Sequence, residues 1–110
     1  MTPTQLDLFT ANAAGQLGMT RAHGAASERA KDACREIMRR RLRVDGWVFG
    51  DDVRDEATKQ LERDGDPLPT DWRFVGSLFQ RLGKLGIARQ AESRPSKYSH
   101  GSPRPVWRVT

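Results

Sequence analysis

The sequence lacks several features that would place it in a large functional class. Its 110 residues contain no apolar run of the roughly 18 residues that a membrane span requires. The N-terminus has no basic start followed by an apolar stretch, so no secretory signal is expected. A single cysteine, Cys34, cannot form an internal disulfide, and no Cys-x-x-Cys or His-x-x-x-His spacing suggests a metal site. These absences predict a small cytoplasmic protein without a membrane partner or a cofactor.

Charge is present with an excess of one sign, and it is placed unevenly. Nineteen Lys and Arg against fourteen Asp and Glu give a net charge of +5. Residues 1–26 sum to zero, residues 27–71 to −2 and residues 72–110 to +7. A single-sign field on one stretch of a small domain is expected for a protein with a polyanionic partner. The alternative is that the charge serves solubility alone.

The first 26 residues differ from the rest in composition. They carry few large apolar side chains, show no helical or alternating pattern, and contain glycines that oppose a helix. We therefore expect a flexible tail over residues 1–26 and one folded domain over residues 27–110.

A first helix is predicted over residues 27–42. Ser27 suits the N-cap position, and apolar residues recur after it at spacings of three and four. Cys34 falls within that stripe, which predicts a buried structural thiol. Four arginines end the helix: Arg39, Arg40, Arg41 and Arg43. They either complement the helix dipole or bind phosphate.

The next stretch predicts a turn, a short strand and a second helix. Residues 45–46 suit a turn, residues 47–49 form a β-type apolar run, and an acidic helix of about three turns begins at Asp51 or Asp52. Acids in a first helical turn interact favourably with the helix dipole, which explains them better than metal binding does. A Gly- and Pro-containing loop over residues 64–69 follows the helix.

The basic third of the chain predicts one helix and two strands. The helix covers residues 72–84, capped by Thr70 or Asp71, and Gly86 suits its C-terminal stop. Its apolar residues make one strong face, and its polar face has no acidic residue. Strands are predicted over residues 87–91 and 106–109, with a long hairpin loop over residues 92–105 between them.

This order of elements resembles the winged helix-turn-helix family. The stretch WRFVGSLFQRLGKLGIA, residues 72–88, is similar to the family's recognition helix and its entry into the wing, and residues 47–49 resemble its short first strand. The resemblance covers about residues 27–110. It implies a mostly helical α+β fold of three helices and a wing of two or three strands. The proline-containing turn between the second and third helices is longer than the family's usual turn.

The resemblance also implies DNA binding. The third helix of the family lies in the major groove, and the wing contacts phosphates or the adjacent minor groove. The implied contact residues are Arg73, Ser77, Gln80, Arg81 and Lys84 on the helix, and Arg89, Arg94, Lys97, Tyr98, His100 and Arg104 in the wing. The alternative is a winged helix that contacts another protein. No catalytic arrangement of Ser, His, Cys and Asp can be assembled from the sequence, so an enzyme is not expected.

The most specific string in the sequence lies near its beginning. Gln5, Leu6, Asp7, Leu8 and Phe9 resemble the pentapeptide by which bacterial replication and repair proteins dock on the sliding clamp. Every position matches the usual form, Gln-Leu-(Ser or Asp)-Leu-Phe. The resemblance implies that the apolar side chains fill a pocket on the clamp. Two alternatives are a chance match and packing of these side chains on the domain itself.

The sequence therefore predicts a bacterial or bacteriophage adaptor that binds DNA and docks on the sliding clamp. Two other hypotheses remain open. One is a winged-helix transcription regulator whose tail is incidental, and the other is a clamp inhibitor without DNA affinity. On the first hypothesis the protein would be found in the cytoplasm and on the nucleoid.

Overall fold

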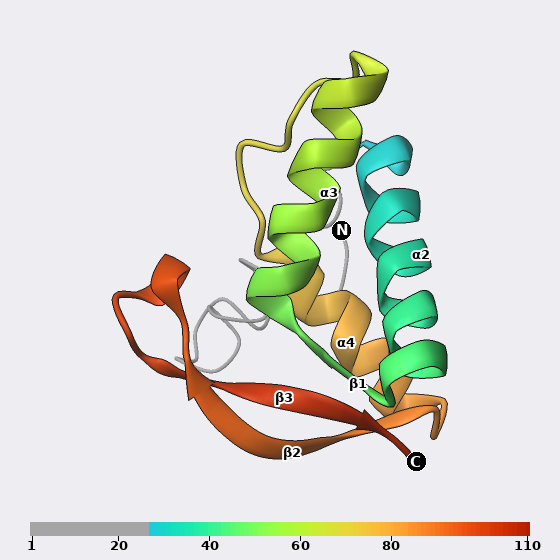
Figure 1. The fold of residues 1–110 in the computed structure, drawn as a ribbon, viewed down its shortest axis with the longest axis vertical. Helices are drawn as coiled ribbons and strands as arrows, with labels where there is room; N and C mark the ends of the chain where they lie inside the picture. The colour runs from blue at the N-terminus through green and yellow to red at the C-terminus, as the bar shows by residue number, and fades with distance from the viewer. Residues whose placement is uncertain (1–26) are drawn as a thin grey trace, which may run out of the picture.

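A computed structural model describes residues 27–110, and the expected tail over residues 1–26 lies outside the described residues. The elements are α2 (Glu28–Asp45), β1 (Trp47–Phe49), α3 (Gly50–Asp64), α4 (Phe74–Lys84), β2 (Ala88–Pro95), the short 3-10 helix η2 (Lys97–Ser99) and β3 (Pro103–Val109) (Figure 1). The expected α+β class is confirmed as three α-helices and a three-stranded antiparallel sheet over these residues.

Helix α2 begins where the sequence predicts and ends later. The Ser27 hydroxyl oxygen accepts a hydrogen bond from the backbone N–H of Ala30 at 3.1 Å, which confirms the N-cap. The helix continues to Asp45, three residues beyond the predicted end. Gly46 stops it because its φ of 79° is left-handed, a conformation that costs glycine little.

Helix α4 begins two residues later than predicted. An Asp71 carboxylate oxygen accepts a hydrogen bond from the backbone N–H of Arg73 at 2.9 Å. Asp71 therefore caps a separate turn, and the regular helix starts after it at Phe74. At the other end, Gly86 has a φ of 73° and the backbone N–H of Ile87 bonds to the carbonyl of Leu82 at 3.0 Å. This arrangement is the expected glycine stop.

Strand β3 lies between the other two strands of the sheet and pairs antiparallel with both. The prediction of a loop over residues 92–105 is wrong, because β2 continues to Pro95 and β3 starts at Pro103. Residues 103–105 pair with β2 alone, and β2 is an edge strand. A proline lacks an N–H donor, and a strand with one unpaired side tolerates that loss. A register shift between Gln90 and Ser93 interrupts the pairing of β2 with β3.

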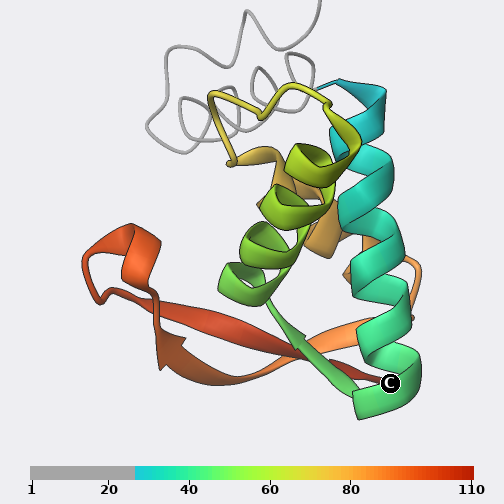
Figure 2. The ribbon, with the colours of Figure 1, turned by 45° about the horizontal axis from the view of Figure 1, so that its top comes forward.

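The three helices lie on one side of the sheet, and the β2–β3 hairpin runs out beyond them (Figures 1 and 2). The core forms where helices and sheet meet. There the Phe79 ring stacks on the Trp107 ring at a centroid distance of 5.4 Å, and Phe74 is fully buried. The expected burial of Cys34 is confirmed, and burial raises the pKa of its thiol to about 12. Between residues 27 and 110, no helix combines the length and apolarity that crossing a bilayer requires.

Candidate nucleic-acid interface

The residues predicted on the third helix do lie on the solvent side of α4. Arg73, Ser77, Gln80 and Lys84 recur at spacings of four, three and four, which places them along one face of the helix. Arg73, Gln80 and Lys84 are exposed, and Ser77 is half-buried. The buried residues of the helix lie on the opposite side: Phe74, Val75, Leu78 and Phe79. The polar face is therefore free of packing against the sheet.

Two of these four side chains already have partners within the protein. The Arg73 guanidinium forms an ion pair with Asp71 at 2.6 Å, and the hydrogen bonds from Arg73 hold the pKa of the Asp71 carboxyl below its usual value. The Ser77 hydroxyl donates to the carbonyl oxygen of Phe74 at 2.8 Å. Arg81 is exposed but turns toward α2, where it lines a hollow between the two helices. Gln80 and Lys84 therefore form the centre of the polar face.

The β2–β3 hairpin sets arginines opposite one another. Arg94 pairs with Arg104 across the two strands, and Arg89 pairs with Arg108. Glu92 neutralises Arg108 through an ion pair of 2.6 Å, and the hydrogen bond from Arg108 lowers the pKa of the Glu92 carboxyl. Like charges directly opposite each other on a sheet are destabilising. Within the described chain, neither Arg94 nor Arg104 forms an ion pair with a carboxylate, although the charge of Arg94 also helps to lower the pKa of Glu92.

An aromatic ring lies beside these arginines. The Arg94 guanidinium stands over the ring of Trp47 at 4.5 Å from its centroid. Trp47 is the first residue of β1, and its strand partner is Arg108. No local pattern in the sequence predicts this contact, because strand register alone brings Trp47 to the arginines of the hairpin. A cation over an indole ring is held in place while its charge stays available to solvent.

The tip of the hairpin, residues 96–102, is fastened to α3. The Ser96 hydroxyl and the Lys97 backbone N–H donate to the two carboxylate oxygens of Asp51, at 2.7 and 2.9 Å. The Lys97 ammonium forms an ion pair with Asp55 at 2.6 Å, and the Tyr98 hydroxyl donates to the same carboxylate. Lys97 and Tyr98 therefore contact α3 rather than projecting alone from the hairpin.

These contacts change the acid–base properties of the hairpin tip. Partial burial raises the pKa of Asp55, but hydrogen bonds from Lys97 and Tyr98 outweigh it, and the net pKa falls below the ordinary value. The bond to Asp55 raises the pKa of the Tyr98 hydroxyl. The Arg54 guanidinium lies 3.8 Å from the centroid of the Tyr98 ring. Sequence reasoning missed Arg54, because no local pattern links α3 to a loop more than forty residues away.

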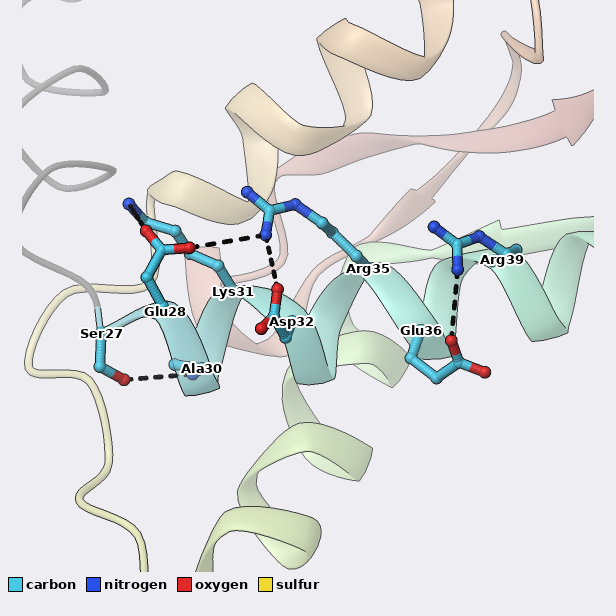
Figure 3. A network of polar contacts seen from close by, with 8 residues as sticks. All are labelled: Ser27, Glu28, Ala30, Lys31, Asp32, Arg35, Glu36 and Arg39. Carbon is cyan, nitrogen blue, oxygen red and sulfur yellow. Dashed lines mark hydrogen bonds and ion pairs between the residues drawn. The ribbon is translucent and has the colours of Figure 1, made fainter.

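The arginines of α2 are largely used within the protein. Along the helix, Arg35 pairs with Asp32 at 2.8 Å and Arg39 pairs with Glu36 at 3.4 Å (Figure 3). Arg40 and Arg41 both reach Glu56 on α3. Three members of the arginine cluster therefore hold carboxylates of the same domain, and two of these fasten α2 to α3.

Other basic side chains have no ion pair among residues 27–110. They are Arg43, Arg54, Lys59, Arg81, Lys84, Arg89, Arg94 and Arg104. Five of these belong to α4 and the β2–β3 hairpin, and every one of the five was predicted to contact DNA. His100 is exposed at the hairpin tip with a left-handed φ of 54°.

The described residues hold no group of three His, Cys, Asp or Glu side chains that could bind a metal ion. The predicted clamp-binding residues, Gln5 to Phe9, lie outside the part of the chain that the structure describes. The chain matches no protein-family model, and neither the curated proteins nor the solved structures give a match.

Proposed function

We propose that residues 27–110 form a winged helix-turn-helix domain that binds DNA. The order of the elements supports this proposal, since a short strand follows the first helix and a hairpin follows the third. The sheet order β1-β3-β2 supports it as well, because β1 pairs with the second strand of the hairpin. In this arrangement α4 is the recognition helix and the β2–β3 hairpin is the wing.

The observation that carries the proposal is the set of basic side chains without carboxylate partners on α4 and the hairpin. Arg81, Lys84, Arg89, Arg94 and Arg104 form no ion pair with an acidic side chain among the described residues. DNA carries a dense line of phosphates, and each Lys or Arg side chain that neutralises a phosphate releases a condensed counterion. The facing pair Arg94 and Arg104 gains most, because a phosphate between two guanidinium groups also removes their mutual repulsion.

The polar face of α4 supplies the side chains for contacts with base edges. An amide such as that of Gln80 can pair with adenine, and a cation such as Lys84 can approach guanine. Arg73 is tied to Asp71, so it reaches a phosphate only by exchanging one anion for another. The same holds for Lys97, which is tied to Asp55. Arg73 and Lys97 therefore contribute less to the affinity for DNA than the basic side chains that form no ion pair.

We also propose that Gln5 to Phe9 dock on the bacterial sliding clamp. The support is the match of all five positions to the clamp-binding pentapeptide. A coil as long as residues 10–26 spans roughly 20–25 Å, which lets one molecule hold the clamp and adjacent DNA together. Two weak contacts on one chain then reinforce each other through effective concentration.

DNA binding is tested by titrating labelled duplex and single-stranded oligonucleotides with the full chain at several salt concentrations. We expect the double variant Arg94→Gln/Arg104→Gln to lose affinity on the order of tenfold or more, with a salt slope smaller by about 2. The matched control is Lys59→Gln/Arg63→Gln, which removes the same charge from α3 and should retain more affinity. Absence of binding to any DNA at low salt contradicts the proposal, as does equal loss in both variants.

Clamp docking is tested by titrating a purified sliding clamp with the full chain. We expect Leu8→Ala/Phe9→Ala to weaken binding by roughly a hundredfold, because two buried apolar anchors are lost. The matched control is Thr2→Ala/Thr10→Ala, which flanks the pentapeptide and should bind as the unaltered chain does. If the Leu8 and Phe9 variant binds as well as the unaltered chain, or if neither binds, the docking proposal fails.

A further inference from the structure

A hollow with a volume of about 360 Å³ lies between the second half of α2 and α4. Apolar side chains from both helices, from the residue before β2 and from the end of β3 line it. Three of them are largely open to solvent: Leu85 is 60% exposed, Ile87 45% and Val109 50%. Apolar side chains gathered around one hollow and left this exposed favour a ligand that covers them.

The charges around this groove have one sign. Arg35, Arg39 and Arg43 line it from successive turns of α2, and Arg81 lines it from α4. No acidic side chain is part of the lining. Arg35 and Arg39 are paired with neighbours on α2, whereas Arg43 and Arg81 have no ion pair within residues 27–110. The groove therefore fits a short segment that carries apolar side chains and a carboxylate.

Two copies of the groove would not fit each other. Face-to-face contact would bring eight arginines together without a carboxylate from either groove, and like charges in contact oppose association. The occupant must therefore supply the negative charge itself.

We propose that the groove binds residues 6–9 of the same chain. Leu6, Leu8 and Phe9 would cover the apolar floor, and the Asp7 carboxylate would pair with Arg43 or Arg81. These four residues combine the two chemical features that the groove lacks a partner for. They also include the one phenylalanine of the segment before residue 27, Phe9, together with its one acidic residue, Asp7.

The length of the chain permits this contact. Ser27 is the N-cap of α2, and the middle of the groove at Arg39 lies 12 residues further along the chain, about 18 Å at 1.5 Å per residue. Residues 10–26 connect the two places, and a coil of that length spans roughly 20–25 Å. A tethered ligand is present at an effective concentration in the millimolar range, so even a weak contact is populated.

The contact would hide the residues that are proposed to dock on the clamp. Binding of residues 6–9 in the groove does not depend on clamp docking, but the regulatory effect of this contact rests on that proposed function. If residues 6–9 occupy the groove for half to nine-tenths of the time, the chain binds the clamp about two- to tenfold more weakly than a chain with an empty groove. Clamp binding would then be strongest when the groove is emptied.

The first test compares backbone amide chemical shifts of the full chain with those of Leu8→Ala/Phe9→Ala. We expect shifts to change at residues 82–87, which border the groove, and not at the hairpin tip. The variant Thr2→Ala/Thr4→Ala is the matched control and should leave residues 82–87 unchanged. Unchanged groove shifts overturn the proposal. Changes that grow with protein concentration overturn it too, because the occupant is then a second copy.

The second test changes residues of the groove and measures the amide chemical shifts of residues 5–9. Leu85→Ser and Arg43→Glu should move the amide shifts of residues 5–9 toward those of a free peptide of residues 1–12. Their matched controls are Val44→Ser and Lys59→Glu, exposed side chains outside the groove lining. The controls should leave the amide shifts of residues 5–9 unchanged. If these shifts in the unaltered chain already equal those of the free peptide, the proposal is overturned.

A clamp titration with the same variants separates this inference from the proposed function. Leu85→Ser and Arg43→Glu should bind the clamp about two- to tenfold more tightly than the unaltered chain. If neither the unaltered chain nor the variants bind the clamp, clamp docking fails as a function. The amide shifts still decide whether the groove holds residues 6–9. If all proteins bind equally and the shifts show no contact, the inference fails alone.

Discussion

The two halves of the described chain use the same residue types for different purposes. Among residues 27–71, seven of ten basic side chains lie in ion pairs, several of them along α2 or between α2 and α3. Among residues 72–110, only three of eight do. The first half is close to neutral because its ten basic residues are matched by twelve acidic ones, and most of these bases pair with acids of the same domain. The second half leaves its charge available to a partner, which the net charge alone does not reveal.

Removing a core side chain shared by both halves should have the largest effect. Phe74 is fully buried at the start of α4 and packs in the core that α2, α3 and the sheet also form. We expect Phe74→Ala to lower the free energy of unfolding by about 3–5 kcal/mol through lost burial and a cavity. Denaturant titration followed by circular dichroism and tryptophan fluorescence measures it. The two signals should change together, and separate transitions would mean that the halves fold independently.

A smaller effect is expected from the ion pairs of the first half. Glu56 holds both Arg40 and Arg41, and the side chains of Glu56 and Arg41 are each only 27% exposed. We expect Glu56→Gln to cost about 1 kcal/mol, because two guanidinium groups lose their shared carboxylate. The matched change in the second half, Glu92→Gln, affects an exposed pair and should cost nothing measurable. Equal losses in chemical denaturation would contradict the comparison.

Removing basic side chains of the second half that form no ion pair should hardly change the free energy of unfolding. Arg94 and Arg104 face each other and neither is in an ion pair, so Arg94→Gln/Arg104→Gln removes a repulsion while giving up the stacking of Arg94 on Trp47. We expect a change of at most about 0.5 kcal/mol in either direction. Thermal unfolding measures this change on the same protein used for DNA titration. A large loss of stability would show that these arginines hold the fold.

The smallest effect concerns the contact between hairpin tip and α3. The Asp55 pKa lies below its ordinary 3.8, so its stabilising contribution is present above that value and is lost as pH falls through the lower folded value. The Tyr98 pKa lies above its ordinary 10.0, so this contribution is lost only as pH rises through the higher folded value. Tyr98 is the only tyrosine, so ultraviolet absorbance follows its ionisation directly.

The variant Asp55→Asn tests this contact. It should bring the Tyr98 pKa back toward 10.0, since the neutral amide accepts a weaker hydrogen bond than the carboxylate. Glu62→Gln, an acidic residue elsewhere on α3, is the control and should leave the titration unchanged. An unaltered Tyr98 pKa in Asp55→Asn would show that the hairpin tip does not rest on α3.

Local signals in the sequence predicted the helices well and the hairpin poorly. Ser27 and Gly86 act through neighbours in the chain, so their capping and stop positions could be read from the sequence. The extension of β2 and β3 could not, because it depends on which strand edges stay unpaired. The hairpin tip depends on Asp51 and Asp55, more than forty residues earlier, and no local pattern carries that information.

The candidate interface shows the same division. The polar face of α4 follows from helical spacing, and the structure places Gln80 and Lys84 on the solvent side as the spacing predicts. Their contact with DNA stays a prediction. The pairing of Arg94 with Arg104, and the position of Arg94 over Trp47, follow from strand register and could not be read from the sequence.

The edge position of β2 has a consequence for the protein in the absence of any partner. An unpaired strand edge is a template on which another chain can add a strand and begin an aggregate. Here the edge carries Arg89 and Arg94, is interrupted by a register shift after Gln90, and ends at Pro95. Repulsion between cations, the irregular register and the missing N–H each oppose strand addition. The arginines that are proposed to bind an anion therefore also oppose aggregation through this strand edge.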